Sequence, residues 1–399
     1  MSIKFAIVSN ALPPESSGQG IALHRILAGV DEDSYILVSR ASRYKDPDSK
    51  PATPSLPTRR VEVEDIYVRL GLAFLSRSYF VDDAISILSL AISLGRIFRA
   101  ENCQIMVVCT GDLYLLPAAM VANKLYGVSY IPYIFDDYAY QWSGRRRIIS
   151  KTMEPYIIRG ASGLICVNYI MAEEYKERYG VDSEIIYNPC SGISGSALRE
   201  KCDSGCEARI VYAGSLYGAH FDAMRNLVEA IKGMEEPKIY LDIYTEQQRQ
   251  AKEAGIDGPQ VRYHEYKENN QILSILEDAD MLYLPMAFKS GLDHVIRTAS
   301  PAKMSEYFST GRPVLAHAPK GSFVLEYIRK HNCGVAIGEN DPASLREAIR
   351  KVLADKEYVN EITANAKNRA KIDFDSDKMR SRFICYLETM AASGSGMGN

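Results

Sequence analysis

The sequence predicts an α/β protein built from two doubly wound domains, each with a parallel sheet. Uninterrupted apolar runs of strand length alternate with helical patterns along both halves of the chain. A strand that is apolar at nearly every position fits a parallel sheet covered by helices on both faces. The chain has 399 residues, more than one ordinary hydrophobic core accommodates, so two cores are expected.

The apolar runs place the expected strands and the boundary between the domains. In the first half the strands are Phe5–Val8, Tyr35–Val38, Ile105–Cys109, Tyr130–Phe135 and Leu164–Val167; in the second they are Ile210–Ala213, Ile239–Ile243, Met281–Leu284, Val314–Ala316 and Val335–Ile337. Between the groups, a stretch rich in Gly, Ser and charge lacks any apolar period, which is typical of a linker. We expect an N-terminal domain over 1–190, a linker over 191–207, a C-terminal domain over 208–374, a helix over 375–391 that packs back on the N-terminal domain, and a flexible tail over 392–399.

Composition narrows the class of protein. Hydrophobic residues make up 47% and charged residues 24%, with a formal net charge of -3, so a nucleic-acid binder is not expected. The eight cysteines are scattered, several of them inside apolar runs, which favours a reducing compartment. Their spacing does not indicate a metal site, and we expect neither a metal nor a cofactor. No apolar stretch suits a signal peptide or a membrane span, so a cytoplasmic protein is expected.

Ligands of doubly wound sheets bind outside the carboxyl ends of the strands, so the loops there hold the candidate residues. The first loop, "SNALPPESSGQG", precedes a helix expected to begin near Ile21. Ser17, Gly18 and Gly20 would allow close backbone approach to a ligand and offer free amides at the start of that helix. The alternative is a helix-entry turn that binds nothing.

The second loop, "IPYIFDDYAYQW", ends an apolar strand with Asp136 and Asp137. Beside Tyr138, Tyr140 and Trp142, these carboxylates would supply a base or a charge stabiliser next to a stacking surface. The alternative is that one aspartate only caps the following turn. We expect at least one of the two to face a cleft.

The third loop lies in "VYAGSLYGAHFDAMRNL", between a strand and a helix expected from about Ala219. Gly214 permits a sharp turn and Ser215 supplies a donor. His220 and Arg225 would direct donor or cationic groups at a phosphate, although a surface arginine is often only solvated.

The fourth loop opens the helix in "TASPAKMSEYFSTGRPVLA". Ser300 is the expected N-cap and Pro301 the first helical residue, which leaves free amides on Ala302, Lys303 and Met304. These amides, the positive end of the helix dipole and the Lys303 ammonium would converge on one place suited to a phosphate or diphosphate.

Glu306 lies one turn further along the same helix. A carboxylate there would accept hydrogen bonds from ribose hydroxyls beyond the phosphates. The alternative is a first-turn glutamate that only complements the helix dipole, and the spacing alone does not decide between them.

Four segments resemble those of a known family, the glycosyltransferases of GT-B fold, and in particular glycosyltransferase family 4, or group 1. They are "RIVYAGSLYG", "VRYHEYKENNQILSILEDADMLYLP", "SPAKMSEYFSTGRPVLA" and "NCGVAIGENDPASLREAI", in the order that a nucleotide-sugar domain uses. The resemblance implies two Rossmann-like domains that face each other across a cleft. It also implies transfer of a sugar from a nucleoside diphosphate donor, with retention of configuration and without a metal.

The resemblance also implies roles for single residues. Glu306 would contact the donor ribose, and residues 300–303 the diphosphate, with Gly214 and Ser215 in the phosphate-side turn. The nucleotide base would be held near residues 263–267, and the first domain would bind the acceptor. The donor-side candidates from these arguments are Gly214, Ser215, His220, Tyr263, Tyr266, Lys267, Arg297, Ser300, Lys303 and Glu306; the catalytic candidates are Asp137 and Asp136; the acceptor-side loop contributes Ser17, Gly18 and Gly20.

The chain departs from the family pattern at three places. The family often carries two glutamates spaced E-x7-E, yet the position eight before Glu306 is Thr298. The turn after Gly214 usually contains Arg and then Lys, where this chain has Ser215 and His220. A histidine of the first domain is matched most simply by Asp137. These changes suggest an altered donor, a repositioned cation such as Lys289, Arg297 or Lys303, or lost activity.

The expected function is a glycosyltransferase that binds a nucleotide-sugar in its second domain and a glycan or lipid-linked acceptor in its first, in polysaccharide or glycoconjugate biosynthesis. One alternative is a nucleotide-sugar epimerase of the same fold, and another is a non-catalytic nucleotide-sugar-binding partner subunit. Residues 70–99, with arginines beside apolar residues, suggest peripheral association with the inner face of a membrane. The same pattern also fits a pair of core helices with solvated ends.

Overall fold

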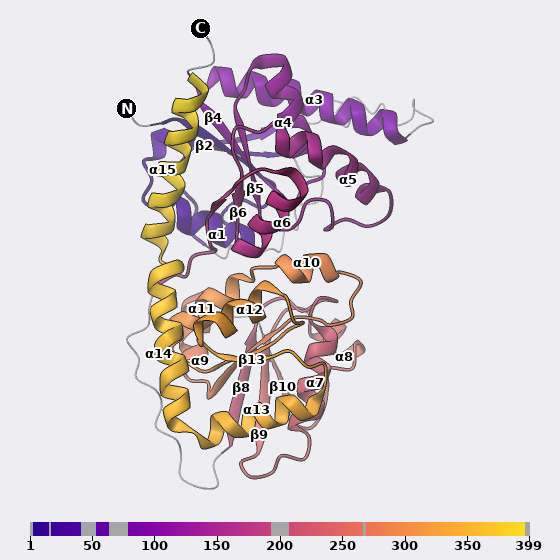
Figure 1. Ribbon diagram of the computed structural model, residues 1–399, viewed down its shortest axis with the longest axis vertical. Helices are drawn as coiled ribbons and strands as arrows, with labels where there is room; N and C mark the ends of the chain where they lie inside the picture. The colour runs from indigo at the N-terminus through magenta and orange to yellow at the C-terminus, as the bar shows by residue number, and fades with distance from the viewer. Residues whose placement is uncertain are drawn as a thin grey trace. The chain divides into compact units, whose positions relative to one another are not determined.

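The computed structural model describes residues 3–15, 17–40, 53–63, 79–192, 207–265 and 269–395. The chain divides into two compact units. The first contains Met1–Tyr187 together with Asp377–Asn399, and the second contains Asn188–Ser376. Each unit is a sheet with helices packed against it (Figure 1).

The described strands of the first unit form one parallel sheet in the order β3-β2-β1-β4-β5-β6-β7. The strands are β1 (Phe5–Val8), β2 (Tyr35–Arg40), β3 (Arg60–Val63), β4 (Ile105–Cys109), β5 (Tyr130–Ile134), β6 (Ile165–Cys166) and β7 (Glu184–Ile185). The helices are α1 (Gly18–Leu27), the 3-10 helix η1 (Glu32–Ser34), α3 (Tyr79–Ala100), α4 (Leu115–Tyr126), α5 (Gly144–Arg159), α6 (Tyr169–Tyr179) and α15 (Ser376–Ser395).

The last helix completes the core of the first unit. Phe383 of α15 packs edge-on against Phe5 of β1, with ring centroids 5.9 Å apart, and lies 6.3 Å from Tyr133 of β5. The hydroxyl of Tyr386 accepts a hydrogen bond from the Leu164 amide at 3.0 Å and donates to the Leu164 carbonyl at 3.2 Å. Helix α15, near the C-terminus, therefore packs against strands of the N-terminal sheet. The helix continues to Ser395, four residues past the end that the sequence predicted.

The second unit has the same arrangement of strands. Its parallel sheet has the order β10-β9-β8-β11-β12-β13 among the described residues. The strands are β8 (Ala208–Ala213), β9 (Ile239–Tyr244), β10 (Val261–His264), β11 (Met281–Pro285), β12 (Val314–His317) and β13 (Val335–Ile337). The helices are α7 (Phe221–Ile231), α8 (Gln248–Glu253), α9 (Asn269–Glu277), α10 (Asp293–Thr298), α11 (Ala302–Thr310), α12 (Phe323–His331), α13 (Pro342–Ala354) and α14 (Lys356–Asp373).

The predicted fold class is confirmed. All ten predicted strands form, because their apolar side chains are buried on both faces of a sheet, as a parallel arrangement requires. The sequence analysis missed β3, β7 and β10, which lie at the edges of the sheets. These strands are only partly buried, so they lack the continuous apolar run that revealed the others.

The described cysteines are free thiols, of which Cys103, Cys109, Cys166, Cys190 and Cys333 are buried and Cys385 is exposed. Burial raises the pKa of the Cys103 thiol to about 11. Within the described ranges, none of the helices has an apolar stretch long enough to cross a membrane.

Gly311 ends α11 in the left-handed conformation, with φ of 71°, so that Pro313 can lead directly into β12. An added Cβ would meet the side chain of Lys367 on α14 and would also carry the backbone cost of this conformation. We expect Gly311→Ala to lower the free energy of unfolding by about 1–2 kcal/mol, measured by urea denaturation.

Gly258→Ala is the matched control, because a Cβ there makes only ordinary contacts with Val228 and Val261, at 3.7 and 4.0 Å. It should be neutral or stabilise the chain by about 0.4–1 kcal/mol. Equal losses in the two variants would show that backbone conformation at Gly311 is not the cause.

Candidate active site

The strand order reverses beside β8 in the second unit, because β9 lies on one side of it and β11 on the other. Loops that leave the carboxyl ends of two such strands diverge and leave room for a ligand. Here the loops are held together: the Ala287 amide donates to the Ala219 carbonyl at 2.7 Å. The Asp222 carboxylate accepts the amides of Phe288 at 2.9 Å and Lys289 at 2.7 Å. Asp222 was not among the predicted site residues. Its sequence context shows only an acidic residue in the first turn of a predicted helix.

Gly214 and Lys303 meet at this end of the sheet. Gly214 has φ of 125°, and a Cβ on it would lie 3.3 Å from Lys303 Nζ. The Lys303 ammonium donates to the Tyr212 hydroxyl at 2.5 Å, and that hydroxyl donates to the Ser215 carbonyl at 2.6 Å. Three predicted residues, Gly214, Ser215 and Lys303, are thus joined through Tyr212, which the sequence analysis did not single out.

Lys303 is a partly buried cation without an acidic partner among the described residues. Burial lowers the pKa of its ammonium to about 7, and its polar contact is the uncharged phenol of Tyr212. It lies in the first turn of α11, where the helix dipole is positive. A bound anion would offset both the desolvation of the ammonium and the unpaired amides of the helix start.

His220 lies beside this lysine as the residue that caps α7. Its ring is buried and packs edge-on against Tyr217, with ring centroids 4.7 Å apart. Burial, and secondarily the Lys303 charge, hold the pKa of His220 well below its usual value. Its Nδ1 atom has no hydrogen-bond partner in the part of the chain that the structure describes. Of the two groups predicted at this position, a hydrogen-bond donor or a cation, this environment favours the neutral, hydrogen-bonding imidazole.

The start of α11 differs in detail from the prediction. Pro301, not Ser300, is the capping residue, and Ser300 uses its carbonyl to accept the Asn188 side-chain amide at 2.7 Å. The Met304 amide, predicted to be free, bonds to the Pro301 carbonyl at 2.9 Å. Only Ala302 and Lys303 of the three predicted amides remain at positions where the helix itself supplies no partner.

Glu306 lies further along α11 and already has a protein partner. Its carboxylate accepts the Ser191 amide at 3.3 Å and the Ser191 hydroxyl at 3.1 Å. Thr298, at the place of the missing glutamate, is fully buried in α10, where its hydroxyl donates to the His294 carbonyl at 3.2 Å. The site therefore contains a threonine packed into the helix where the family often has a carboxylate.

The other described donor-side candidates make contacts of their own. The Tyr263 hydroxyl donates to the Ile256 carbonyl, and Lys252 lies over its ring at 5.1 Å. Arg225 donates to the Ala254 carbonyl at 3.0 Å, a structural contact and not a free phosphate ligand. Arg297 is exposed on α10. Tyr266 and Lys267 lie outside the described residues.

In the first unit, the loop after β1 is already bonded within the protein. The helix begins at Gly18, three residues earlier than expected, and Ser17 caps it by accepting the Gly20 amide at 3.0 Å. A Cβ on Gly20 would lie 2.8 Å from the Glu15 carbonyl oxygen. Gly20 is thus required by close packing of the loop, and its amide is not free for a ligand as predicted.

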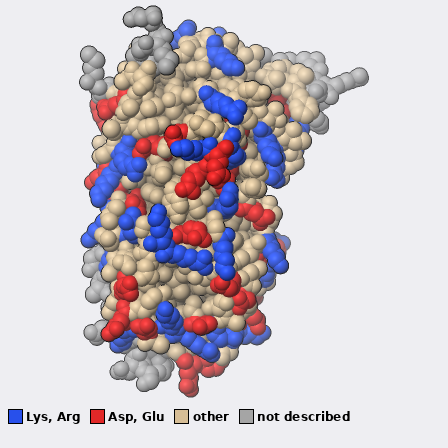
Figure 2. Space-filling model, in the orientation of Figure 1, with Lys and Arg blue, Asp and Glu red and all other residues tan. Residues whose placement is uncertain are grey.

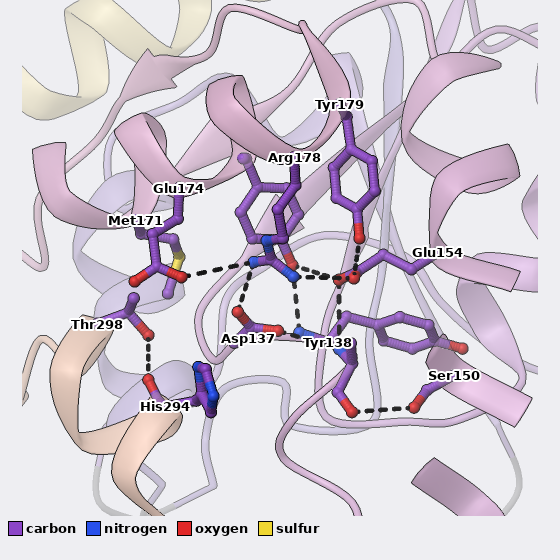
Figure 3. Close-up of polar contacts among 12 residues, drawn as sticks. Asp137, Tyr138, Ser150, Glu154, Met171, Glu174, Arg178, Tyr179, His294 and Thr298 are labelled. Carbon is purple, nitrogen blue, oxygen red and sulfur yellow. Dashed lines mark hydrogen bonds and ion pairs between the residues drawn. The ribbon is translucent and has the colours of Figure 1, made fainter. Parts of the chain in front are cut away.

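The two adjacent aspartates after β5 have opposite environments. Asp137 is fully buried; its carboxylate contacts Arg178 at 2.5 Å and accepts the Ala139 amide at 3.1 Å (Figure 3). Asp136 is exposed, and its amide donates to the Thr110 hydroxyl at 3.2 Å. Of the two, Asp136 is the carboxylate that solvent reaches.

Asp137 belongs to a buried network around a single cation (Figure 3). Arg178 of α6 also contacts Glu154 of α5 at 3.1 Å and Glu174 at 3.9 Å. The hydroxyls of Tyr175 and Tyr179 donate to Glu154. Burial, and secondarily the Asp137 charge, raise the pKa of Glu154, because one guanidinium does not neutralise three carboxylates.

Sequence analysis missed a polar group at the strand reversal of the first unit, beside β1 and β4. The Asn10 side chain donates to Asp112 at 2.8 Å and accepts the Arg40 amide at 3.0 Å. Asp112 also accepts the amides of Tyr114 and Leu115, at 2.7 and 3.0 Å, and so caps α4. Asn10 and Asp112 come from the loops after β1 and β4, and Arg40 is the last residue of β2, so no short motif connects them.

Comparison with known proteins places a family match in the second unit. Residues 207–355 match the family model described as glycosyl transferases group 1. None of the curated proteins matches the sequence significantly.

Solved structures share the fold over the whole chain. Sucrose-phosphate synthase from Thermosynechococcus elongatus has a TM-score of 0.68 at 13% identity, covering 98% of this chain and 100% of its own. HepE from Anabaena, in complex with UDP and glucose, has a TM-score of 0.66 at 12% identity, covering 97% and 100%. Trehalose 6-phosphate synthase from Burkholderia multivorans has 0.65 at 11% identity, covering 98% and 100%. The GT-B fold is therefore confirmed, and so is the resemblance to group 1 in the second unit.

The network around Arg178 predicts a large and pH-dependent loss of stability on removing its charge. Arg178→Met would leave buried carboxylates without a cation, and we expect a loss of about 3–5 kcal/mol at neutral pH. The pKa of Glu154, already raised, would rise further. A carboxyl group whose pKa is raised in the folded state destabilises the protein as pH rises above its normal pKa. The loss of unfolding free energy in Arg178→Met should therefore be smaller at acidic pH. Urea denaturation at about pH 8 and about pH 5 measures it.

Arg382→Met provides the matched control, since Arg382 pairs with Glu184 at the surface of the same unit. Its loss should stay below about 1 kcal/mol at both pH values. A deficit in Arg178→Met that does not change with pH would contradict the electrostatic explanation.

Proposed function

We propose that this chain, a glycosyltransferase by its GT-B fold and the group 1 match of its second unit, transfers a sugar from a nucleoside diphosphate donor to a glycan or lipid-linked acceptor. The observation that carries the proposal is Lys303: a cation with no described acidic partner, in the first turn of α11 and in contact with Gly214. A site of this kind fits the diphosphate of such a donor. Synthesis of a polysaccharide or glycoconjugate is the proposed setting.

Lys303 and the start of α11 would neutralise the diphosphate as it leaves. In the transfer, the bond between the anomeric carbon and the diphosphate oxygen breaks, and a bond from the acceptor oxygen to that carbon forms. The departing diphosphate takes the bonding electrons, and one of its oxygens accepts the proton that the acceptor hydroxyl gives up. Stabilising that developing charge is the largest contribution this site would make. Arg297 and Lys289 are further candidate cations, and Glu306 would exchange its Ser191 contact for the donor ribose.

The acceptor side is proposed to lie in the first unit. Asp136 is better placed than Asp137 to contact an acceptor hydroxyl, because Asp136 is exposed whereas Asp137 is fully buried against Arg178. Asp137 would then be a positioning residue that fixes the loop carrying Asp136. Retention of configuration and transfer without a metal are part of the proposal, and rest on the family resemblance.

UDP is the first nucleotide to test. Structures with this fold include HepE in complex with UDP-glucose, although that likeness, at 12% identity, concerns the fold. A melting screen of the purified chain against UDP, GDP, dTDP and ADP sugars would identify the donor. If none of them raises the melting temperature, the proposed donor site is wrong.

Measuring conversion of the nucleotide sugar, with and without an acceptor, distinguishes two other functions from sugar transfer. A nucleotide-sugar epimerase of the same fold would convert the donor without an acceptor. A non-catalytic partner subunit would bind the donor without converting it, and the buried Thr298 in place of a carboxylate favours this alternative over the epimerase. We place the protein in the cytoplasm, supported by the free thiols among its described cysteines.

Lys303→Met tests the donor site, because methionine keeps the length of the side chain and removes its charge. We expect the affinity for the nucleotide sugar that binds in the screen to fall roughly 10- to 100-fold, as when a charged hydrogen bond is lost. Thermal stability should hold or rise, because the folded state lowers the pKa of Lys303 and therefore disfavours its charged form. Calorimetric titration and thermal melting measure the two effects.

The exposed Lys232 of the same unit provides the control, and Lys232→Ala should leave the affinity unchanged. If Lys303→Met binds the donor as tightly as the unaltered chain, Lys303 does not contact the diphosphate.

The pKa of Lys303, about 7, makes donor binding pH-dependent. The diphosphate of a nucleotide sugar stays fully ionised through neutral pH, so the lysine supplies the change of charge. Because the protonated form binds the anion, affinity should fall as pH rises above about 7. The same titration of Lys303→Met should show no such fall. A pH-independent affinity in the unaltered chain would mean that Lys303 stays charged throughout.

A further inference from the structure

The solvent face of the first half of α3 is apolar. Phe80, Val81, Ile85 and Leu88 are 60%, 48%, 40% and 48% exposed. They recur at helical spacing over three turns, with exposed Ala84 between them. A surface helix of a water-soluble domain normally turns polar residues outward and apolar ones inward. Here the apolar side chains remain outside, although α3 also has a buried face that includes Leu90, Ala91 and Leu94.

A basic group adjoins this stripe on α5. Arg145, Arg146, Arg147 and Lys151 all lie in the first half of that helix. Arg146 lies over the Trp142 ring at 5.9 Å, and Arg147 and Lys151 lie over the Tyr140 ring at 4.9 and 5.5 Å. Ile148, between them, is 61% exposed. Aromatic rings, arginines and exposed aliphatic side chains occur together where a protein meets a lipid headgroup layer.

Direct contacts join the two helices into one surface. Arg145 of α5 forms an ion pair with Asp83 of α3, and its guanidinium lies 5.4 Å from the centre of the Phe80 ring. Asp83 also accepts the Tyr114 hydroxyl at 2.8 Å, which anchors the pair to α4. In Figure 2 uncharged atoms predominate around α3, and basic side chains lie over the region of α5. We call the surface formed by Phe80, Val81, Ile85, Leu88, Arg146 and Lys151 the α3–α5 face.

We propose that the α3–α5 face binds the anionic surface of a phospholipid membrane. The apolar stripe would enter the boundary between headgroups and acyl chains, and the basic residues would contact lipid phosphates. The basic group is local, since the whole chain has a formal net charge of -3. A second copy of the chain fits less well, because a two-fold contact through this face would bring the same basic residues together. The proposal does not depend on donor binding.

Vesicle co-sedimentation tests the proposal with the full chain. We expect binding to vesicles of phosphatidylcholine with phosphatidylglycerol, and much weaker binding to phosphatidylcholine alone. High salt should weaken vesicle binding, because salt screens the attraction between the basic residues and the anionic lipids. Ile85→Ser/Leu88→Ser should lower the partition by about tenfold or more. Arg146→Ser/Lys151→Ser should lower it by about fivefold for each charge removed.

Matched variants separate this face from general surface effects. Leu125→Ser/Ile372→Ser removes two residues that are 54% and 43% exposed elsewhere, and Arg159→Ser removes an exposed charge at the other end of α5. Both should bind vesicles like the unaltered chain, and all variants should keep its melting temperature. Equal binding to both vesicle types, or equal losses in test and control variants, would overturn the proposal. So would a dimer, seen by light scattering, that Ile85→Ser/Leu88→Ser dissociates while vesicles stay unbound. Nucleotide binding, measured by calorimetry, reports separately on the donor site.

Discussion

Both units depend on one constraint, that a parallel sheet covered on both faces exposes functional groups only at the ends of its strands. The central strands β1, β4, β8 and β11 are buried along most of their length, so their side chains serve the core. At their carboxyl ends the chain turns into loops that diverge where the strand order reverses. The polar groups that fix those turns, Asp112 in one unit and Asp222 in the other, also define where a ligand has room.

The two units differ in how their buried cations are paired. In the first, three carboxylates surround Arg178 and tyrosine hydroxyls donate to Glu154, so the cation has acidic partners within the protein. In the second, Lys303 rests on an uncharged phenol and its pKa is lowered to about 7 by burial. A buried lysine without an acidic partner lowers the stability of the free protein, and a bound anion would remove that cost. Such an environment is characteristic of a binding site. We therefore interpret the Arg178 network as structural, and the environment of Lys303 is consistent with the proposed donor site.

The sequence predicted what depends on local pattern and missed what depends on contacts between distant segments. Central strands can be predicted because their residues form continuous apolar runs. The edge strand β10 is only partly buried and has no such run. Gly214 and Lys303 were each expected at a phosphate, but their close approach, and the bond from Lys303 to Tyr212 of β8, follow from how α11 packs. Likewise, nothing next to Asp137 in the sequence shows that Arg178, on another helix, buries its carboxylate.

Thr298 stands where the resemblance to the family would place a carboxylate. Its side chain is fully buried and bonded to the preceding turn of α10, so no carboxylate is placed there to hold the donor sugar. The loop before α10 has its Phe288 and Lys289 amides already bound by Asp222. Under the proposed function, Lys303 and the start of α11 would bind the diphosphate, and recognition of the sugar would use side chains other than Thr298. Residues 290–300 are the first place to look for donor selectivity, separately from the proposed Lys303 contact.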